Sequence, residues 1–460
     1  MPSTARRLAI EVIQRVEQGG AFLNLALDGA LRSAGAIEPR EAALTTELSY
    51  GTVRWQQELD RAIEAHSARP LAQMDGPVRA VLRLGAFELL HHPTVPARAV
   101  VHQAVELCKE LRAPNAAGFV NAILRRLSEV RVSPPPPSQD TDPIGRIAAI
   151  TSHPRWLVER WSRALGLEET EALCRANQTQ ARATVRRNRK RATLEEAQAA
   201  LLADGLQSEP GLYSPDALVL QEGAPPALDL EGHAQGLFQA QDEAAQLVSL
   251  YAAPSAGARV LDACAAPGGK ACHLAELVGP EGRVVAIDLH ARKTKIIAEA
   301  ARRMGYLNLE ARAADATLPL PGEGPESFDL ILLDAPCSGL GTLRRHPELK
   351  LRRTPEDIDR LATLQLRLLN ALEPLCKKGG LFVFALCTFT PEECDETITR
   401  FLAAHPDFVR EAPPPGWARP AAQALIRDDG ALLALPNRSG TDGFFAIRMR
   451  RAASDSKSGH

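Results

Sequence analysis

The stretch ARVLDACAAPGGK, residues 258–270, decides the fold of the larger part of this chain. Its first seven residues form a short and almost wholly apolar run, which is typical of a strand buried in a parallel sheet. The run leads into a glycine turn and then into a helix. Glycines at this place let the backbone turn tightly and bring its amides close to a ligand, and the helix N-terminus favours negative charge there.

Three further apolar runs follow this stretch, and helical segments separate them. The runs are RVVAID (283–288), FDLILLD (328–334) and GLFVFALC (380–387). Buried strands that alternate with helices predict a doubly wound α/β domain of the Rossmann type. We place this domain at residues 236–451, with a polar tail at 452–460. In such sheets ligands bind at the carboxyl ends of the strands.

The N-terminal part of the chain has a different pattern. Apolar residues recur at helical spacing, for example at Leu8, Val12 and Val16, and strand-like alternation is absent. We therefore expect residues 1–132 to form an all-α domain. The proline-rich segment 133–143 is expected to be a linker, and residues 144–235 a small α/β connector domain.

Composition narrows the class of protein. The chain has 460 residues with 54 basic and 56 acidic side chains, a net charge of −2, and 45% hydrophobic residues. No apolar run reaches the roughly 18 residues that a membrane span needs. Eight cysteines are scattered without paired short spacings, which argues against a disulfide framework and against a zinc module. We expect a cytoplasmic monomer of several domains, with no membrane partner and no metal.

Acidic residues stand at the ends of three predicted strands. Asp288, Asp315 and Asp334 each follow an apolar or strand-like run, and the glycine loop stands at the end of the first strand. The loop lacks both the Walker A pattern and the G-x-G-x-x-G spacing of dinucleotide sites. Three strand-end acids and a glycine turn fit an adenosyl ligand lying across the top of the sheet. Asp288 taken alone has a second interpretation, as a cap of the helix that starts near His290.

Two cysteines also stand at the ends of neighbouring predicted strands. Cys337 lies in DAPCSG, just after the run 328–334, and Cys387 ends the run 380–387. Both thiols are therefore expected to face one crevice. A thiolate beside a basic side chain is a nucleophile. The other interpretation, a zinc site with Cys394 and His346, has no recognisable ligand spacing.

Two local basic runs interrupt the neutral charge balance. They cover residues 181–193 and 342–354. Clustered guanidinium groups can follow the phosphates of a nucleic acid, and a solvated helix face is the alternative for each run. The candidate RNA contacts are Arg186, Arg187, Arg189, Arg344 and Arg345.

Several motifs together resemble a known family. DACAAPGGK, DAPCSGLGTLRRHPELK and the motif around Cys387 are similar to the RNA (cytosine-5) methyltransferase family. The order of motifs over nearly the full chain resembles the bacterial 16S rRNA type, called Sun/RsmB. Segments of the helical part, 44–59, 82–90 and 118–127, look like the NusB-like domain of that type. FQAQDEAAQ (238–246) and DGFFAIRMRR (442–451) look like its flanking methyltransferase motifs.

The resemblance implies a reaction and a cofactor. The reaction is transfer of a methyl group from S-adenosylmethionine to C5 of a cytosine in 16S rRNA, at position 967. Cys387 would attack C6 of the base and Cys337 would assist product release. Asp334 would hydrogen-bond the base edge, and Lys270 would orient groups in the crevice. The cofactor contacts implied are Cys264, Ala265, Ala266, Pro267, Gly268, Gly269, Lys270, Asp288, Asp315 and Asp334.

The chain departs from the family at several positions. Leu386 and Cys394 stand where the family usually has Thr and Asn, and Ala271 replaces a Thr. These departures change the hydrogen bonds expected around the nucleophile. A transfer-RNA cytosine-5 methyltransferase is the alternative in the same class. A non-catalytic RNA-binding or antitermination-like factor is the alternative in a different class. The adjacent glycines and the two thiols disfavour an NAD(P) oxidoreductase.

Overall fold

The computed structural model of the protein describes residues 3–221, 223 and 230–453. The chain forms two compact units. The first contains the residues up to Gln180 together with Leu343–Arg352, and the second contains Ala181–Thr342 and the residues from Arg353 onward. The chain therefore passes from the second unit into the first after Thr342 and returns at Arg353.

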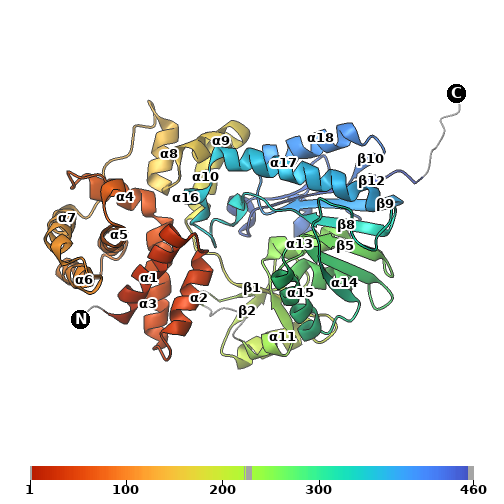
Figure 1. Ribbon diagram of the computed structural model, residues 1–460, viewed down its shortest axis with the longest axis horizontal. Helices are drawn as coiled ribbons and strands as arrows, with labels where there is room; N and C mark the ends of the chain where they lie inside the picture. Colours follow the sequence, from red (N-terminus) through yellow and green to blue (C-terminus); the bar gives the residue numbers. More distant parts are fainter. Residues whose placement is uncertain (1–2, 222, 224–229, 454–460) are drawn as a thin grey trace. The chain divides into compact units, whose positions relative to one another are not determined.

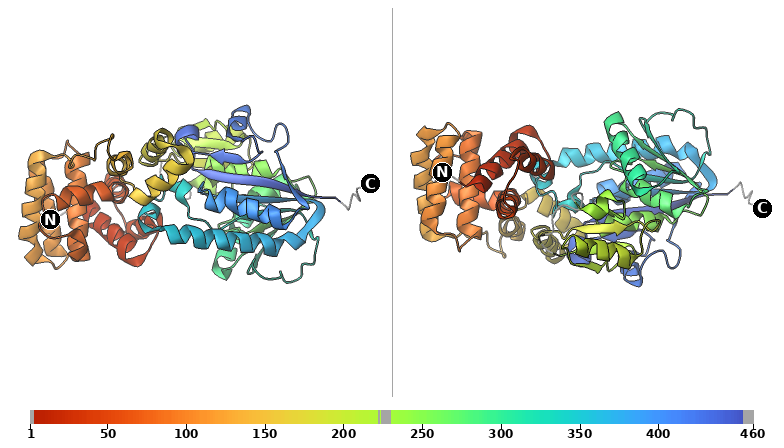
Figure 2. Two further views of the ribbon diagram at one scale, coloured as in Figure 1. Left: turned by 90° about the horizontal axis from the view of Figure 1, so that it is seen from above. Right: turned by 90° about the horizontal axis from the view of Figure 1, so that it is seen from below.

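In its described residues the first unit is built from helices, as Figures 1 and 2 show. This confirms the predicted all-α N-terminal part. The helices are α1 (Thr4–Gly19), α2 (Leu23–Ser33), α3 (Pro39–Arg54), α4 (Gln56–Glu64), η1 (Leu71–Gln73), α5 (Gly76–His91), α6 (Ala97–Glu110), η2 (Pro114–Ala116), α7 (Ala117–Val130), α8 (Pro143–Thr151), α9 (Arg155–Leu165), α10 (Leu167–Asn177) and α16 (Leu349–Arg352).

Helix α1 shows why this part of the sequence is helical. The hydroxyl of Ser3 accepts a backbone amide of the first turn, and Gly20 ends the helix with φ of 64°, which a glycine adopts without strain. The predicted apolar face, Leu8, Val12 and Val16, is buried in the core that the helices share. Burial of this face provides most of the stability, since isolated helices of this length are marginal in water.

The segment Leu343–Arg352 is an unusual part of the first unit because it is fixed by buried charged side chains. The Lys350 ammonium is 2% exposed and donates to the carbonyl oxygen of Arg54 at 2.8 Å. Glu348 is 1% exposed and accepts the backbone amide of Leu23 at 3.0 Å. Burial, and then repulsion from the Arg54 guanidinium, lower the pKa of Lys350 to about 7.

The second unit contains a small antiparallel sheet of four strands in the order β2-β3-β1-β4. One face of this sheet packs with α11 around Val185, Leu218 and Phe238, which are all buried. The elements are β1 (Thr184–Arg187), α11 (Leu194–Ala203), β2 (Ser208–Pro210), β3 (Ala217–Leu220), α12 (Glu231–Ala234) and β4 (Phe238–Ala240).

The larger sheet of this unit has the order β10-β12-β9-β8-β5-β6-β7, with β11 beside β12. Strands β9, β8, β5, β6 and β7 are parallel, and β12 runs antiparallel to β9. The strands are β5 (Arg259–Ala263), β6 (Arg283–Asp288), β7 (Leu309–Ala313), β8 (Phe328–Asp334), β9 (Cys376–Leu386), β10 (Phe408–Glu411), β11 (Leu432–Ala434) and β12 (Phe444–Arg451).

Helices cover both faces of the larger sheet. Figure 1 shows α13, α14 and α15 on one side of the strands and α17 and α18 on the other. The helices are α13 (Glu243–Ala252), α14 (Gly269–Leu277), α15 (Ala291–Met304), α17 (Pro355–Leu372), α18 (Thr397–Ala404) and α19 (Pro436–Ser439), with short turns η4 (Leu340–Thr342), η5 (Glu373–Leu375), η6 (Glu392–Glu396) and η7 (Pro420–Leu425).

The predicted doubly wound α/β domain is confirmed. The four apolar runs fall on β5, β6, β8 and β9, and the strand expected before Asp315 is β7. Chain order reverses between β5, which lies beside β6, and β8 on its other side, so the crevice of such sheets lies at the carboxyl ends of β5 and β8. Among the helices that the structure describes, none combines the length and apolar character that a bilayer crossing requires.

The helices α8, α9 and α10 belong to the first compact unit, whereas the four-stranded sheet belongs to the second. The segment 144–235 that the sequence predicts as one connector is thus divided between the two units. The domain limits that the sequence predicts therefore remain a prediction.

The buried amine of Lys350 predicts a pH dependence of stability. Because its pKa is lowered from 10.5 to about 7, the unfolded chain binds more protons than the folded chain across this window, and stability rises with pH. Between pH 7 and pH 10 we expect the free energy of unfolding to rise on the order of 1 kcal/mol per pH unit from this group. Lys350→Met should remove that contribution.

Urea denaturation at several pH values tests this expectation. Tryptophan fluorescence is a suitable signal because Trp55, Trp156 and Trp161 all lie in the first unit. Lys109→Met is the matched control, since that amine is 56% exposed. Parallel pH profiles for the wild type and Lys350→Met would contradict the account of a buried neutral amine.

Candidate active site

The loop between β5 and α14 brings backbone groups to the carboxyl edge of the sheet. Cys264 begins the loop with φ of 63°, and Gly268 ends it with φ of 103°, where an added Cβ would lie 3.2 Å from the Cα of Ile297. The amide of Ala265 donates to the carbonyl oxygen of Ile287 on β6 at 2.8 Å. This geometry requires glycine at Gly268 and fixes the loop beside the start of α14. The predicted cofactor residues on this loop are Cys264, Ala265, Ala266, Pro267, Gly268, Gly269 and Lys270.

Lys270 and Asp334 form an ion pair at this edge. The Lys270 Nζ lies 2.7 Å from the Asp334 Oδ2 and 4.9 Å from the centre of the Phe444 ring. Burial opposes the charge of Lys270, but the Asp334 carboxylate outweighs it, so the pKa of Lys270 is raised. The Asp334 carboxylate thus favours the charged form of Lys270 at this edge of the sheet.

Asp262, in β5, is a buried acid without a partner. Its side chain is fully buried, and neither carboxylate oxygen has a hydrogen-bond partner among the described residues. Burial, and then the Asp334 charge, raise the pKa of Asp262 well above the ordinary value, against the opposing effect of Lys270. A buried polar group that lacks a partner is costly, so this carboxyl suits a ligand donor near the loop.

Asp288 and Asp315 end β6 and follow β7 at the same edge. The Asp288 Oδ1 accepts the backbone amide of His290 at 3.0 Å, and its Oδ2 lies 3.9 Å from the Nζ of Lys293. Asp315 accepts the amide and hydroxyl of Thr317, which lowers the pKa of Asp315. The amide that Asp288 accepts belongs to His290, the N-cap residue of α15, so Asp288 does not cap the first turn of that helix. Its contact with ribose stays a prediction.

The two cysteines of the predicted crevice lie in contact. The Sγ atoms of Cys337 and Cys387 are 3.2 Å apart. The amide of Gly341 donates to the carbonyl oxygen of Cys387 at 3.0 Å, and an added Cβ on Gly341 would overlap the carbonyl oxygen of Gly443. The hydrogen bond to Cys387, followed by burial, raises the pKa of Cys337 well above the ordinary value.

Other polar side chains around this thiol pair were not predicted as functional. Ser338, Thr388, Gln365 and Glu393 are all buried and hydrogen-bonded to one another or to the cysteine loops. Nothing in a single sequence marks a serine or glutamine as part of such a network. The only available signal was the position of Glu393 in the motif that follows Cys387.

Arg186, in the basic run 181–193, is predicted to contact RNA, and the structure shows that this prediction is wrong. This side chain is 0% exposed, with its Nε on the Oε1 of Gln241 at 2.9 Å and an ion pair to Glu276 at 3.4 Å. A fully buried guanidinium cannot reach a phosphate. Arg187 and Arg189 both pair with Asp216, at 3.0 and 2.6 Å, and retain partial exposure.

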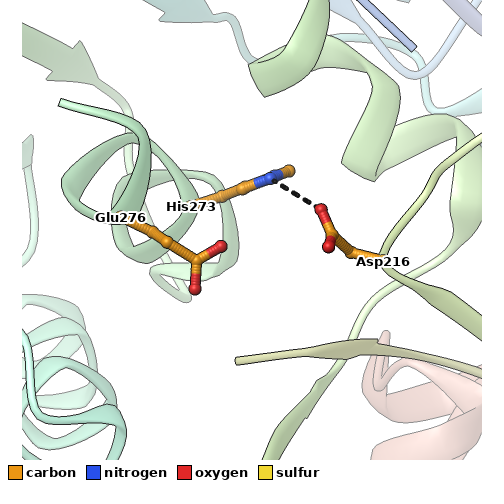
Figure 3. A group of neighbouring side chains, drawn as sticks. All are labelled: Asp216, His273 and Glu276. Atoms are coloured by element: carbon orange, nitrogen blue, oxygen red, sulfur yellow. Dashed lines mark ion pairs between the residues drawn. The ribbon is translucent and has the colours of Figure 1, made fainter. Parts of the chain in front are cut away.

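The run also fixes the cofactor-side helices. Figure 3 shows Asp216, His273 and Glu276, the last two on α14. Both carboxylates already bind guanidinium groups of the run, so a divalent cation in this cluster would meet strong repulsion. Burial, and then Arg186 and Arg189, lower the pKa of His273 well below the ordinary value. The cluster therefore ties the small sheet to α14.

The second basic run, 342–354, contains Arg344 and Arg345. Arg344 donates to the carbonyl oxygen of Gln180 at 3.2 Å, and its own carbonyl oxygen accepts Arg54 at 2.9 Å. Both arginines are half-buried. Lys350 in the same run is buried, so the run as a whole is not a solvated face. Contact of these arginines with RNA stays a prediction.

Known proteins resemble this chain over its whole length. Family models match it as 16S rRNA methyltransferase RsmB/F at residues 249–450, as the NusB family at 3–129, and as the ferredoxin-like domain of RsmF/B-like methyltransferases at 153–226. The probable ribosomal RNA small subunit methyltransferase B of Bacillus subtilis is 37% identical over 98% of this chain and 99% of that protein. The ribosomal RNA small subunit methyltransferase B of Pseudomonas syringae is 35% identical over 99% of this chain and 98% of that protein.

A solved structure has the same fold over nearly the full chain. The crystal structure of PH0851 superposes with a TM-score of 0.83, at 26% sequence identity, over 98% of this chain and 99% of that one. The fold of the chain is thus shared with that structure.

The buried arginine gives a test of the corrected interpretation. Arg186→Met should lower the free energy of unfolding by about 3 kcal/mol, because Glu276 would lose a buried partner. The affinity for RNA and its salt dependence should stay at wild-type values, since a buried side chain releases no counterions. Denaturation and RNA titrations at several salt concentrations measure both.

Arg163→Met is the control, because that guanidinium is 74% exposed in a surface pair with Glu159. A flatter salt dependence in Arg186→Met, with unchanged stability, would restore the prediction that the run contacts phosphates.

Proposed function

Because the chain belongs to the RsmB/F family of rRNA methyltransferases, we propose that it methylates C5 of a cytosine in 16S rRNA, at position 967, in the cytoplasm and as a monomer. As a member of this family it is an S-adenosylmethionine-dependent methyltransferase. The observation that carries the proposal is the contact of two thiols, Cys337 and Cys387, at the sheet edge that also bears the glycine loop.

The chemistry of cytosine explains why a thiol is needed. C5 of the base is a poor nucleophile. A thiolate that adds to C6 converts the ring into an enamine, whose C5 is nucleophilic enough to take a methyl group. A base then accepts the C5 proton, which allows the sulfur to leave C6 with the electrons of the C6–S bond and restores the C5–C6 double bond. The proposal thus requires a nucleophile and a group that assists elimination.

We assign Cys387 as the nucleophile and Cys337 as the group that assists release. A cation beside a cysteine favours its nucleophilic form, and Lys270 interacts electrostatically with Cys387. Cys337 has a raised pKa and therefore holds its proton in the resting site. A protonated thiol 3.2 Å from the nucleophile can move a proton to and from the departing sulfur.

Asp334 is assigned to the edge of the base. Its Oδ2 accepts Lys270, so Oδ1 is the oxygen that we place against N3 of the ring. A shared proton there would withdraw electron density from C6 and favour attack.

S-adenosylmethionine supplies the methyl group when it is bound. The loop 264–270 provides backbone amides beside the N-terminus of α14, and the unpartnered carboxyl of Asp262 suits the cationic amino group of the cofactor. We assign Asp288 to the ribose hydroxyls and Asp315 to the adenine end of the cofactor. These residues orient the cofactor against the thiol pair and hold it in the crevice.

The two thiols should behave differently when replaced. Cys387→Ala removes the nucleophile, so methyl transfer should fall by at least about 1,000-fold while cofactor binding persists. Cys337→Ala should allow attack and methyl transfer but slow elimination, and a covalent protein–RNA adduct should accumulate. Denaturing gels before and after RNase treatment detect that adduct, with the buried Cys376→Ala as control.

Three outcomes contradict parts of this proposal. An adduct in Cys387→Ala but not in Cys337→Ala would exchange the two roles. Normal methyl transfer in both variants would make both thiols structural. Transfer to tRNA but not to 16S rRNA would favour the other substrate class.

Asp288 gives a separate test of the cofactor site. Asp288→Ala leaves ribose hydroxyls without their acceptor and should weaken S-adenosylmethionine binding by about 10- to 100-fold. Calorimetry measures this directly, and Asp359→Ala on the exposed face of α17 is the control. Wild-type affinity in Asp288→Ala would leave this side chain only its hydrogen bond with the backbone amide of His290.

A further inference from the structure

Glu393 is a buried carboxylate that the proposed chemistry does not use. Its side chain is 0% exposed and lies in η6, the turn after β9. Its Oε1 accepts the backbone amide of Ser338 at 2.8 Å and the Nε2 of Gln365 at 3.0 Å. Its Oε2 accepts the hydroxyl of Thr390 at 2.7 Å. Four lone-pair positions of one carboxylate thus meet three buried donors.

These donors belong to the two loops that carry the thiols. Ser338 directly follows Cys337, and Thr390 follows Cys387 by three residues. A second bond, from the Ser338 hydroxyl to the Thr388 hydroxyl at 2.9 Å, runs parallel to the first connection. Glu393 therefore joins a loop after β8 to a loop after β9, which share no covalent bond near this point.

Helix α17 closes the network. The Gln365 Nε2 that donates to Glu393 also donates to the carbonyl oxygen of Pro336, the residue before Cys337, at 2.9 Å. The carbonyl oxygen of Ser338 accepts the Nε of Arg353 at 2.8 Å. Backbone groups on both sides of Cys337 are thus fixed, and the loop has little freedom to move its sulfur.

A buried charge held only by neutral donors is expensive. No ion pair to Glu393 exists among the described residues, although desolvation of a carboxylate costs several kcal/mol. Hydrogen bonds to an ionised acceptor are about twice as strong as neutral ones, and three of them offset much of this cost. The arrangement also places a negative charge next to one thiol of the pair.

We propose, on the basis of the two-thiol function above, that Glu393 is a positioning residue: it sets the separation of the two sulfur atoms and makes the thiols chemically different, so that Cys387 and not Cys337 is the nucleophile. The connection through Ser338 and Thr390 sets the separation. The charge of Glu393 distinguishes the thiols, because it disfavours a thiolate on Cys337.

The surroundings of Cys337 support this distinction. The pKa of Cys337 is raised by its hydrogen bond to Cys387, by burial, and then by the charges of Cys387, Glu393 and Asp334. The cation of the crevice, Lys270, is paired with Asp334 and responds to the charge of Cys387. The two identical side chains therefore differ in their surroundings: the charges of Glu393 and Asp334 act on Cys337, whereas Lys270 interacts with Cys387.

The first test measures sulfur separation and requires no RNA or cofactor. The thiol oxidant diamide takes two electrons and two protons from Cys337 and Cys387 to form a disulfide and becomes the hydrazine. Mass spectrometry of the full chain under non-reducing conditions gives the rate. We expect rapid formation in the wild type and a rate at least about tenfold lower in Glu393→Ala, where the loops lose their connection.

The second test measures the charge. Glu393→Gln keeps the shape and most hydrogen bonds but removes the negative charge, so alkylation of Cys337 by iodoacetamide should shift to lower pH and become about three- to tenfold faster near pH 8. The rate of disulfide formation in Glu393→Gln should stay near the wild-type value. A residue that only held the loops in place would not change thiol reactivity while leaving the sulfur separation unchanged. Glu396→Gln is the matched control, because this acid is exposed in the same turn.

Each result has a defined meaning. An unchanged pH profile in Glu393→Gln, with a wild-type disulfide rate in Glu393→Ala, would overturn the proposal. If Glu393→Ala does not fold, the Glu393→Gln profile decides alone. A wild-type chain that forms no disulfide would also contradict it. Lack of methyl transfer in a wild-type chain that behaves as expected in both tests would count against the proposed function only.

Discussion

The parallel arrangement of β9, β8, β5, β6 and β7 is the constraint on which the rest of the structure depends. Parallel strands bring all their carboxyl ends to one edge of the sheet, so strand direction alone brings residues that are far apart in the chain together there. The glycine loop, Lys270, Asp334 and the thiol pair come from three different strand ends. The chain order reverses between β5 and β8, where these groups converge and where ligands bind in such sheets.

Buried charged side chains hold the segments around this edge of the sheet in place. Arg186 and Glu276 tie the small sheet to α14, the helix that begins at the cofactor loop. Glu393 ties together the loops that carry the two thiols. In each case a charge is withdrawn from water and given hydrogen-bond partners from distant segments. Such networks contribute modestly to net stability, but they penalise any other arrangement of the same loops.

The sequence predicted features that depend on local pattern and missed those that depend on distant partners. Apolar runs and strand-end residues located β5, β6, β8 and β9 and the thiol pair, because burial and strand direction leave a periodic signal. The basic run 181–193 predicts phosphate contacts or a solvated helix face. Its carboxylate partners Asp216 and Glu276 lie 27 and about 90 residues away from the arginines, so no local pattern shows that the charges are neutralised.

The same limit applies to the segment Leu343–Arg352 and to Glu393. Burial of Lys350 depends on a carbonyl oxygen 296 residues earlier in the chain, and a run of basic residues gives no indication of it. Glu393 lies 55 residues from Ser338 and looks like one of several acids in a polar turn. The departures at Leu386 and Cys394 also proved compatible with an ordered site. The Cys394 thiol faces the carbonyl oxygen of Thr388 at 3.8 Å, and Thr388 keeps its bond to Ser338.

Bisulfite sequencing of rRNA and tRNA tests the central claim most directly, because it shows cytosine-5 methylation at each base. The comparison is between the source organism, a strain that lacks the gene, and that strain carrying either the wild-type gene or Cys387→Ala. The account predicts that one 16S rRNA cytosine, at position 967, loses protection in the deletion strain. The wild-type gene should restore the protection, and Cys387→Ala should not. Unchanged protection of every 16S rRNA cytosine after deletion would contradict it.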